Sequence, residues 1–255
     1  MSILELSGVC KDFGGLRAVD RMDLAVEEGS ISGLIGPNGS GKSTLFNLIA
    51  GMYRADEGTI RFAGQEIQRL PMHRIAQRGL VRTFQKTTVF ADLSVFENTR
   101  IGTFTRTNAS LLDCVLRTRS ESAERAASRV RAEEILDFLG LRAMSETLAN
   151  NLPYGLLRHL EIAIALAAGP RLLLLDEPAA GLNAEETQAL MRSLRQIRER
   201  GITLLLVEHD MKLVMNICDR ITVINEGQKI AEGLPLEVSH NPDVVRVYLG
   251  AELEL

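Results

Sequence analysis

A glycine-rich loop that contains one lysine limits the possible folds of this chain more than any other feature. The loop matches the pattern GxxxxGKS and consists of Gly36, Pro37, Asn38, Gly39, Ser40, Gly41, Lys42 and Ser43. A short apolar segment at 30–35 predicts a strand before it, and the segment 44–50 is compatible with a helix after it. Glycines let the backbone turn tightly enough for several N–H groups to face one anion at the positive end of that helix. The order strand, loop and helix therefore predicts an α/β fold with a phosphate-binding loop.

Two side chains at the end of this loop indicate the anion. Lys42 can place a positive charge on the outer phosphates of a nucleotide, and the hydroxyl of Ser43 is a ligand for Mg²⁺. An unrelated glycine-rich turn would not need a strand before it and a helix after it. We therefore expect ATP and Mg²⁺ as cofactors.

An acidic pair follows a buried strand later in the chain. The run Leu172–Leu175 is continuously apolar, which is typical of a parallel strand covered on both faces, and Asp176 and Glu177 follow it. Ligands of open α/β sheets bind at the carboxyl ends of the strands. We expect Asp176 to reach Mg²⁺ through water and Glu177 to polarise the water that attacks the terminal phosphate. Without the phosphate loop, the same pair would indicate only a solvated strand end.

A histidine occupies the corresponding place after a second buried strand. The apolar run 202–207 predicts that strand, and the helix expected at 185–200 connects the two strands as a βαβ crossover. His209 is predicted to bond the terminal phosphate, and the alternative is a surface histidine after a strand. The other histidines have no such setting and are expected to be structural or exposed: His73, His159 and His240.

The remaining strands are predicted near the two ends of the chain. Alternating apolar residues at 3–9 and 19–26 predict half-exposed strands. Segments 221–225 and 228–231 flank a Glu-Gly pair and predict a hairpin.

A different composition marks the middle of the chain. The stretch 93–160, with an Arg- and Glu-rich helix at 121–139, is expected to be a helical insertion. We therefore predict one discontinuous core, formed by 1–92 and 161–255, that carries this helical subdomain.

Charge and cysteine content narrow the function classes. The net charge of -4 and the pI near 5.7 argue against a nucleic-acid partner. Cys10, Cys114 and Cys218 are scattered, so we expect neither a disulfide framework nor a metal site. Free cysteines of this kind are typical of a reducing compartment, which we expect here. The N-terminus does not resemble a cleavable signal, and every apolar run falls far short of the roughly 20 residues that a membrane span needs. We expect a cytoplasmic chain that reaches a membrane only through a partner.

These motifs, in this order, resemble those of the ATP-binding-cassette ATPases, and among them the ATPase subunits of branched-chain amino acid importers of the LivG type. The resemblance covers essentially the whole chain. Its landmarks are Gly36–Thr44, Arg82–Gln85, Val89–Asn98, Asn151–Gly155, Asp176–Asn183, Glu208–Asp210 and Asn241–Asp243. It implies one ATPase domain over 1–255: a P-loop NTPase (RecA-like) core with a mainly parallel sheet, an N-terminal antiparallel β-subdomain and an inserted α-helical subdomain.

The resemblance also implies roles for individual residues. Two subunits would enclose each ATP between the phosphate loop of one, including Thr44, and the signature segment of the other. Phe13 would stack on adenine, which an aromatic face suits, and the alternative is a core Phe on an edge strand. Gln85 would link Mg²⁺ and the attacking water to the membrane partner, acting both in catalysis and as a metal ligand. Asn183, where the family usually has Asp, would lie in the loop between the two sites. The implied metal ligands are Ser43, Gln85 and Asp176.

The partners follow from the same resemblance. They are a second ATPase subunit, identical or different, two transmembrane permease subunits and, indirectly, an extracytoplasmic substrate-binding protein, with no nucleic acid. The chain would act at the cytoplasmic face of the cell membrane. Apolar Val89, Phe90 and Phe96 in the segment 85–96 are expected to contact the membrane partner.

The signature segment departs most from the family. The usual Leu-Ser-Gly-Gly-Gln is here Leu152–Leu156, and Pro153 offers a phosphate neither a hydroxyl nor an N–H. Pro and Tyr are familiar in the LivG subgroup, so Pro153, Tyr154 and Gly155 are still expected to bind the partner's nucleotide, aided by the dipole of a helix at 157–168. Four further positions differ from the Gln and Arg usual in the subgroup and leave the rate of hydrolysis open: Leu156, Leu157, His159 and Ile164.

The resemblance implies that ATP binding closes two subunits and that hydrolysis at Glu177 reopens them, which would drive the membrane subunits between inward- and outward-facing states. Branched-chain amino acids are the expected transported substrate, with urea, other amino acids or amides, and aromatic acids as alternatives. Two other classes stay open. One is a soluble cassette ATPase that acts on DNA or ribosomes, against which the acidic balance and the missing coiled-coil arm argue. The other is an ATP-binding regulatory protein without turnover, which Leu156 and Leu157 motivate.

Overall fold

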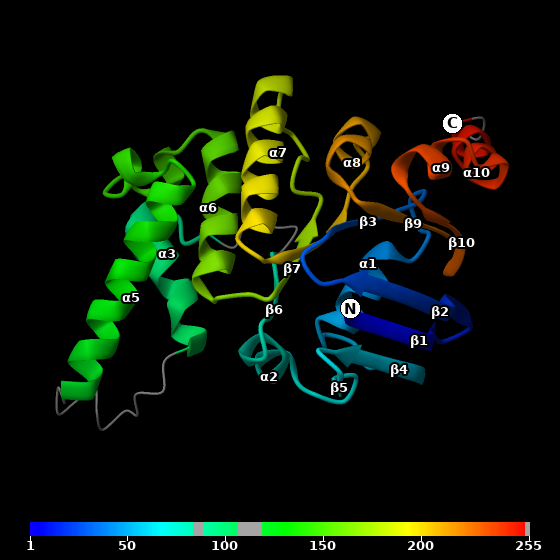
Figure 1. Cartoon of the computed structure of the whole chain (residues 1–255), viewed down its shortest axis with the longest axis horizontal. Helices are drawn as coiled ribbons and strands as arrows, with labels where there is room; N and C mark the ends of the chain where they lie inside the picture. The colour runs from blue at the N-terminus through cyan, green and yellow to red at the C-terminus, as the bar shows by residue number, and fades with distance from the viewer. Residues whose placement is uncertain (84–88, 107–118, 253–255) are drawn as a thin grey trace. The chain divides into compact units, whose positions relative to one another are not determined.

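The computed structural model describes residues 1–83, 89–106 and 119–252, which fall into two compact units (Figure 1). The first unit contains Met1–Arg82 and Arg171–Leu255, and the second contains Thr83–Pro170. None of the helices in the described part of the chain has the length and apolar character that a bilayer crossing requires.

The first unit is built around a six-stranded sheet with the strand order β10-β9-β3-β8-β7-β6. Its strands are β3 (Ile31–Ile35), β6 (Leu80–Arg82), β7 (Leu172–Asp176), β8 (Thr203–Val207), β9 (Arg220–Asn225) and β10 (Gln228–Gly233). Neighbouring strands are parallel, except in the β9–β10 hairpin. Every residue of β3, β7 and β8 is buried, which explains their continuous apolar sequences. The carboxyl ends of these three strands meet at one edge of the sheet.

A second, antiparallel sheet in the same unit has the order β2-β1-β4-β5. Its strands are β1 (Ser2–Phe13), β2 (Leu16–Glu27), β4 (Glu57–Phe62) and β5 (Gln65–Glu66). Helix α1 (Lys42–Ile49) lies between the two sheets (Figure 1), and its buried side chains Leu45, Phe46, Leu48 and Ile49 belong to the core that both sheets share. Both sheets therefore hold the helix that follows the phosphate loop.

The other helices of this unit are α2 (Met72–Gln77), α7 (Ala184–Glu199), α8 (Met211–Ile217), α9 (Pro235–Ser239) and α10 (Pro242–Glu252). Helix α7 connects the parallel neighbours β7 and β8 and buries Leu190, Leu194 and Ile197, which confirms the predicted βαβ crossover.

The second unit is helical. It contains α3 (Val95–Gly102), α5 (Arg119–Phe138), α6 (Tyr154–Ala167) and three short 3-10 segments, Thr103–Arg106, Arg142–Met144 and Ala149–Asn151. These three α-helices, the ones in the described part of the unit, pack on one another. At Gly102, a Cβ would overlap the carbonyl group of Ile164, so glycine allows α3 to approach α6 closely.

The α/β class with an antiparallel sheet and a separate helical unit is confirmed. The helical unit, however, extends over 83–170, whereas the sequence predicts an insertion at 93–160. The reason is that α6 is one continuous helix that packs on α3 and α5, so a boundary at residue 160 would divide it. Helix α6 also begins at Tyr154, three residues before the predicted start at 157.

Candidate nucleotide-binding site

The glycine-rich loop connects β3 to α1. Gly39 and Gly41 have φ angles of 77° and 103°, in the left-handed region that favours glycine. A Cβ on Gly41 would lie 2.5 Å from the carbonyl oxygen of Ala18, and one on Gly36 would overlap the carbonyl group of Ile224. The path of the loop therefore requires glycine where it passes the neighbouring strands β2 and β9.

Lys42 is buried and folded back onto its own loop. Its Nζ donates hydrogen bonds to the carbonyl oxygens of Gly36 and Pro37, at 2.8 and 2.7 Å. Burial lowers the pKa of Lys42, while the nearby carboxylates of Glu177 and Asp176 act in the opposite direction. The ammonium group thus lies within the loop and in the electrostatic field of the acidic pair that ends β7.

Asp176 ends β7, and its two carboxylate oxygens differ in their hydrogen bonding. Oδ2 accepts a hydrogen bond of 2.7 Å from Nη2 of Arg82. Oδ1 is buried and has no hydrogen-bond partner among the described residues. Mg²⁺ prefers oxygen ligands and is usually held by one or two carboxylates together with substrate phosphates. The open oxygen of Asp176 and the exposed hydroxyl of Ser43, in the first turn of α1, fit such an ion.

Arg82, whose side chain is only 8% exposed, is a residue of this site whose role the sequence motifs do not reveal. Besides Asp176, its guanidinium donates to Oδ1 of Asn47 at 2.5 Å, and its central carbon lies 5.7 Å from the ring centroid of Phe46. Asn47 and Phe46 belong to α1. Arg82 therefore connects the acidic end of β7 to the helix of the phosphate loop. Its position depends on β6, a strand of only three residues that the sequence pattern does not reveal.

Glu177 and His209 meet at the carboxyl ends of β7 and β8. Oε1 of Glu177 and Nε2 of His209 lie 3.1 Å apart, and both side chains are partly exposed. The backbone N–H of Glu177 donates to the carbonyl oxygen of Val207 at 2.9 Å, and its φ angle is 47°. A left-handed conformation is unusual for a residue other than glycine, so the backbone at Glu177 is strained. The structure places the predicted base and the predicted phosphate sensor in direct contact.

Glu208 is a second residue of this site whose role the sequence motifs do not reveal. Its side chain is buried: Oε1 accepts from the N–H of Ala179 at 2.7 Å, and Oε2 accepts from the N–H of His209 at 3.1 Å. Burial raises the pKa of Glu208, although these hydrogen bonds oppose the shift. The carboxyl group thus connects the loop after β7 to the loop that carries His209.

The remaining predicted residues of the first unit have separate places. Phe13 ends β1 and is 42% exposed, which excludes the alternative of a core Phe. Asn183 caps α7, and its side chain accepts hydrogen bonds from two N–H groups of the first turn. Gln85 lies outside the described residues, so its predicted roles stay predictions.

The signature segment forms the start of α6 in the second unit. Pro153 is the residue before the helix, and Tyr154 and Gly155 lie in its first turn, where backbone N–H groups have no partner within the helix. Nη2 of Arg158 donates to the hydroxyl of Tyr154 at 2.6 Å, and Nη1 donates to Oε2 of Glu161 at 2.9 Å. This buried arginine therefore fixes the aromatic side chain that replaces the usual small residue. His159 is structural, since its Nδ1 bonds the carbonyl oxygen of Gly155 at 2.9 Å.

A glycine-rich loop before α1, an acidic pair after β7 and a histidine after β8 define the class of phosphate-loop nucleoside triphosphatases. A family model described as "ABC transporter" matches residues 19–180, and one described as "Branched-chain amino acid ATP-binding cassette transporter" matches residues 228–254. The chain therefore belongs to the ABC transporter family and is an ATPase.

Individual proteins give the same result. The chain is 43% identical over 249 residues to the high-affinity branched-chain amino acid transport ATP-binding protein BraF of Pseudomonas aeruginosa, covering 97% of this chain and 98% of that protein. It is 42% identical over 249 residues to LivG of Escherichia coli K12, a protein of the same description, with the same coverage. A solved structure, a nucleotide-free ATP-binding cassette from an ABC transporter, is 33% identical to this chain and has a TM-score of 0.85. The match covers 97% of this chain and 99% of the solved chain.

Proposed function

We propose that this chain is the ATP-hydrolysing subunit of an importer that takes up branched-chain amino acids. One observation carries the chemistry: the carboxylate of Glu177 contacts the imidazole of His209 at 3.1 Å. The match at 228–254 and the identity to BraF and LivG support the choice of substrate.

Nucleotide binding uses the glycine-rich loop, the ligands for Mg²⁺ and one aromatic ring. The phosphates of ATP bind to N–H groups of the loop 36–43, and the ammonium of Lys42 exchanges its two carbonyl contacts for phosphate oxygens. Ser43, Asp176 and Gln85 would hold Mg²⁺, which would supply positive charge to the phosphate oxygens. The adenine base stacks on the exposed ring of Phe13.

Hydrolysis then needs a base and a group that recognises the terminal phosphate. The carboxylate of Glu177 accepts a proton from water while the water oxygen bonds the terminal phosphorus, and the bond from that phosphorus to the oxygen of ADP breaks. His209 hydrogen-bonds the terminal phosphate and keeps the carboxylate of Glu177 oriented. ADP and inorganic phosphate leave as products.

The complete site needs a partner. A second ATPase subunit supplies Pro153, Tyr154 and Gly155 from the start of its α6 to the nucleotide of the first. ATP binding closes the two ATPase subunits and hydrolysis reopens them, and this motion is passed to two permease subunits. An extracytoplasmic binding protein delivers the substrate. The chain acts at the cytoplasmic face of the membrane, and the exposed ring of Phe90 is one candidate for the permease contact.

The test is phosphate release and uptake by the complete transporter in proteoliposomes. Glu177→Gln abolishes both, while the matched control Glu185→Gln, an exposed carboxylate in the first turn of α7, leaves both unchanged. Phosphate release that survives Glu177→Gln contradicts the assigned base. ATP-dependent uptake of urea or aromatic acids without uptake of leucine, isoleucine or valine contradicts the assigned substrate.

A further inference from the structure

Two exposed aromatic rings lie together at the end of β1. The rings of Phe13 and Tyr53 have centroids 5.3 Å apart and planes inclined by 74°, an edge-to-face arrangement. The two residues are 42% and 40% exposed, so the contact is not part of the apolar core. The ammonium of Lys11 lies over the ring of Phe13, 5.3 Å from its centroid. One face of Phe13 is therefore covered by a cation, and the ring retains open surface.

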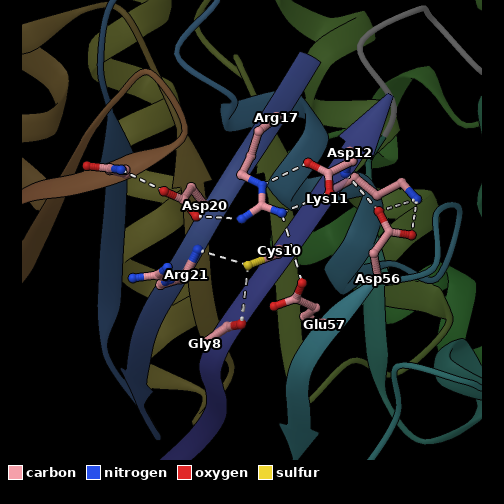
Figure 2. Close-up of polar contacts among 10 residues, drawn as sticks. Gly8, Cys10, Lys11, Asp12, Arg17, Asp20, Arg21, Asp56 and Glu57 are labelled. Atoms are coloured by element: carbon pink, nitrogen blue, oxygen red, sulfur yellow. Dashed lines mark hydrogen bonds and ion pairs between the residues drawn. The ribbon is translucent and has the colours of Figure 1, made fainter. Parts of the chain in front are cut away.

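The loop that carries Tyr53 is fixed to β1 by hydrogen bonds at Asp56. This carboxylate accepts from Nζ of Lys11 at 2.9 Å and from the N–H of Asp12 at 2.7 Å (Figure 2). The N–H of Asp56 donates to the carbonyl oxygen of Cys10 at 3.0 Å. Lys11 thus contacts the loop and Phe13 at once.

The same loop is fixed to the end of α1. The N–H groups of Met52 and Tyr53 both donate to the carbonyl oxygen of Asn47, at 2.9 and 3.1 Å. Because α1 begins at the phosphate loop, Tyr53 is held by the element that binds the phosphates and by the strand that carries Phe13.

The hairpin that carries Phe13 is held on its other side as well. Arg17 donates to both carboxylate oxygens of Asp12, at 2.9 and 3.0 Å, and to Asp20 at 3.2 Å (Figure 2). Asp20 in turn accepts from the amide of Gln228 at 2.7 Å. Side chains from three strands therefore contact one another at the end of the hairpin.

We propose that Tyr53 is a positioning residue for Phe13: its perpendicular ring holds Phe13 in the orientation in which the exposed surface of the ring receives the purine base of the nucleotide. This inference rests on the proposed function, in which Phe13 stacks on adenine. A ring that is already oriented loses less conformational freedom when the base binds, so the contact raises affinity for the base without touching the phosphates.

The test compares two ligands on the purified full chain. ATP carries the base, and inorganic tripolyphosphate carries only the phosphates; both affinities are measured by calorimetry. An edge-to-face pair contributes about 0.5–1.5 kcal/mol, so Tyr53→Leu should weaken ATP binding about 2- to 12-fold and leave tripolyphosphate binding unchanged. Tyr53→Phe keeps the ring and should restore ATP binding to within about twofold. The exposed aromatic Phe104 supplies the control, since Phe104→Leu changes neither affinity.

The other outcomes separate this inference from the proposed function. Equal losses for ATP and tripolyphosphate in Tyr53→Leu overturn the inference, because Tyr53 would then act through α1 and the phosphate loop. Unchanged ATP binding in Tyr53→Leu also overturns it if Phe13→Leu weakens ATP about 5- to 150-fold, the range expected for one lost base–aromatic stack. If Phe13→Leu also leaves ATP binding unchanged, the proposed adenine site is wrong and this inference fails with it.

Discussion

Replacing Arg82 by Met should destabilise the first unit through the charge it leaves behind. The side chains of Arg82 and Asp176 are only 8% and 2% exposed, and their nearest nitrogen and oxygen atoms lie 2.7 Å apart. Methionine keeps much of the apolar contact with Phe46 but removes the guanidinium, so the carboxylate of Asp176 stays buried without its cation. Removing one partner of a buried ion pair costs about 3–5 kcal/mol, and we expect a loss of that size in the free energy of unfolding.

Urea unfolding followed by circular dichroism measures this loss. Arg61→Met is the matched control, because Arg61 and Glu66 form a pair at 3.3 Å whose side chains are 52% and 53% exposed. Such a surface pair contributes about 0–1 kcal/mol. The double variant Arg82→Met with Asp176→Asn removes both charges, so it should lose less stability than the sum of the two single variants. A loss for Arg82→Met no larger than that of the control, or strict additivity in the double variant, would refute the reasoning.

Three further predictions concern other parts of the chain. Gly102→Ala places a Cβ against the carbonyl group of Ile164 and should cost about 1–3 kcal/mol in thermal unfolding. The control is Gly15→Ala, where a Cβ meets open space, and it should cause no loss of stability. Equal melting temperatures for Gly102→Ala and Gly15→Ala would contradict the close approach of α3 to α6. Asn183→Ala removes the cap of α7 and should lower the free energy of unfolding in urea by about 1 kcal/mol. Asn183→Ser keeps a capping side chain and should retain most of that stability. Burial raises the pKa of Cys218 from 9.0 to about 12, so the native thiol should resist alkylation at pH 8, as mass spectrometry would show, until the chain unfolds. The stability linked to this thiol is fully present below pH 9 and is lost as the pH rises toward 12; equal labelling of native and unfolded protein at pH 8 would contradict the assignment.

The buried strands of the parallel sheet were predictable because their environment leaves few alternatives. Strands β7 and β8 are covered on both faces, so their sequences are continuously apolar, and the polar residues that follow must leave the sheet at its carboxyl edge. Glu177 and His209 follow these strands, and their contact agrees with the expectation that both serve one site. The apolar pattern of each strand was sufficient to predict that Glu177 and His209 lie at one edge of the sheet, because the end of a strand determines where the next side chain lies.

The contacts that hold the acidic end of β7 were not predictable in the same way. Arg82 and Asp176 are separated by 94 residues, and Glu208 and Ala179 by 29 residues. No periodicity connects such pairs, because they meet only after the sheet has formed. The start of α6 was missed for a different reason: Pro153 offers no side-chain cap, so the usual signal for a helix N-terminus is absent from the sequence.

In the proposed function, the left-handed backbone of Glu177 means that this position exchanges folding stability for chemistry. For an L-residue such a conformation costs about 1–2 kcal/mol, and glycine adopts it without that cost. Glu177→Gly would therefore abolish hydrolysis while relaxing the turn between β7 and α7. An inactive subunit of this kind would be as well folded as the active one, and it would compete for places in the proposed two-subunit assembly instead of being removed as a misfolded chain.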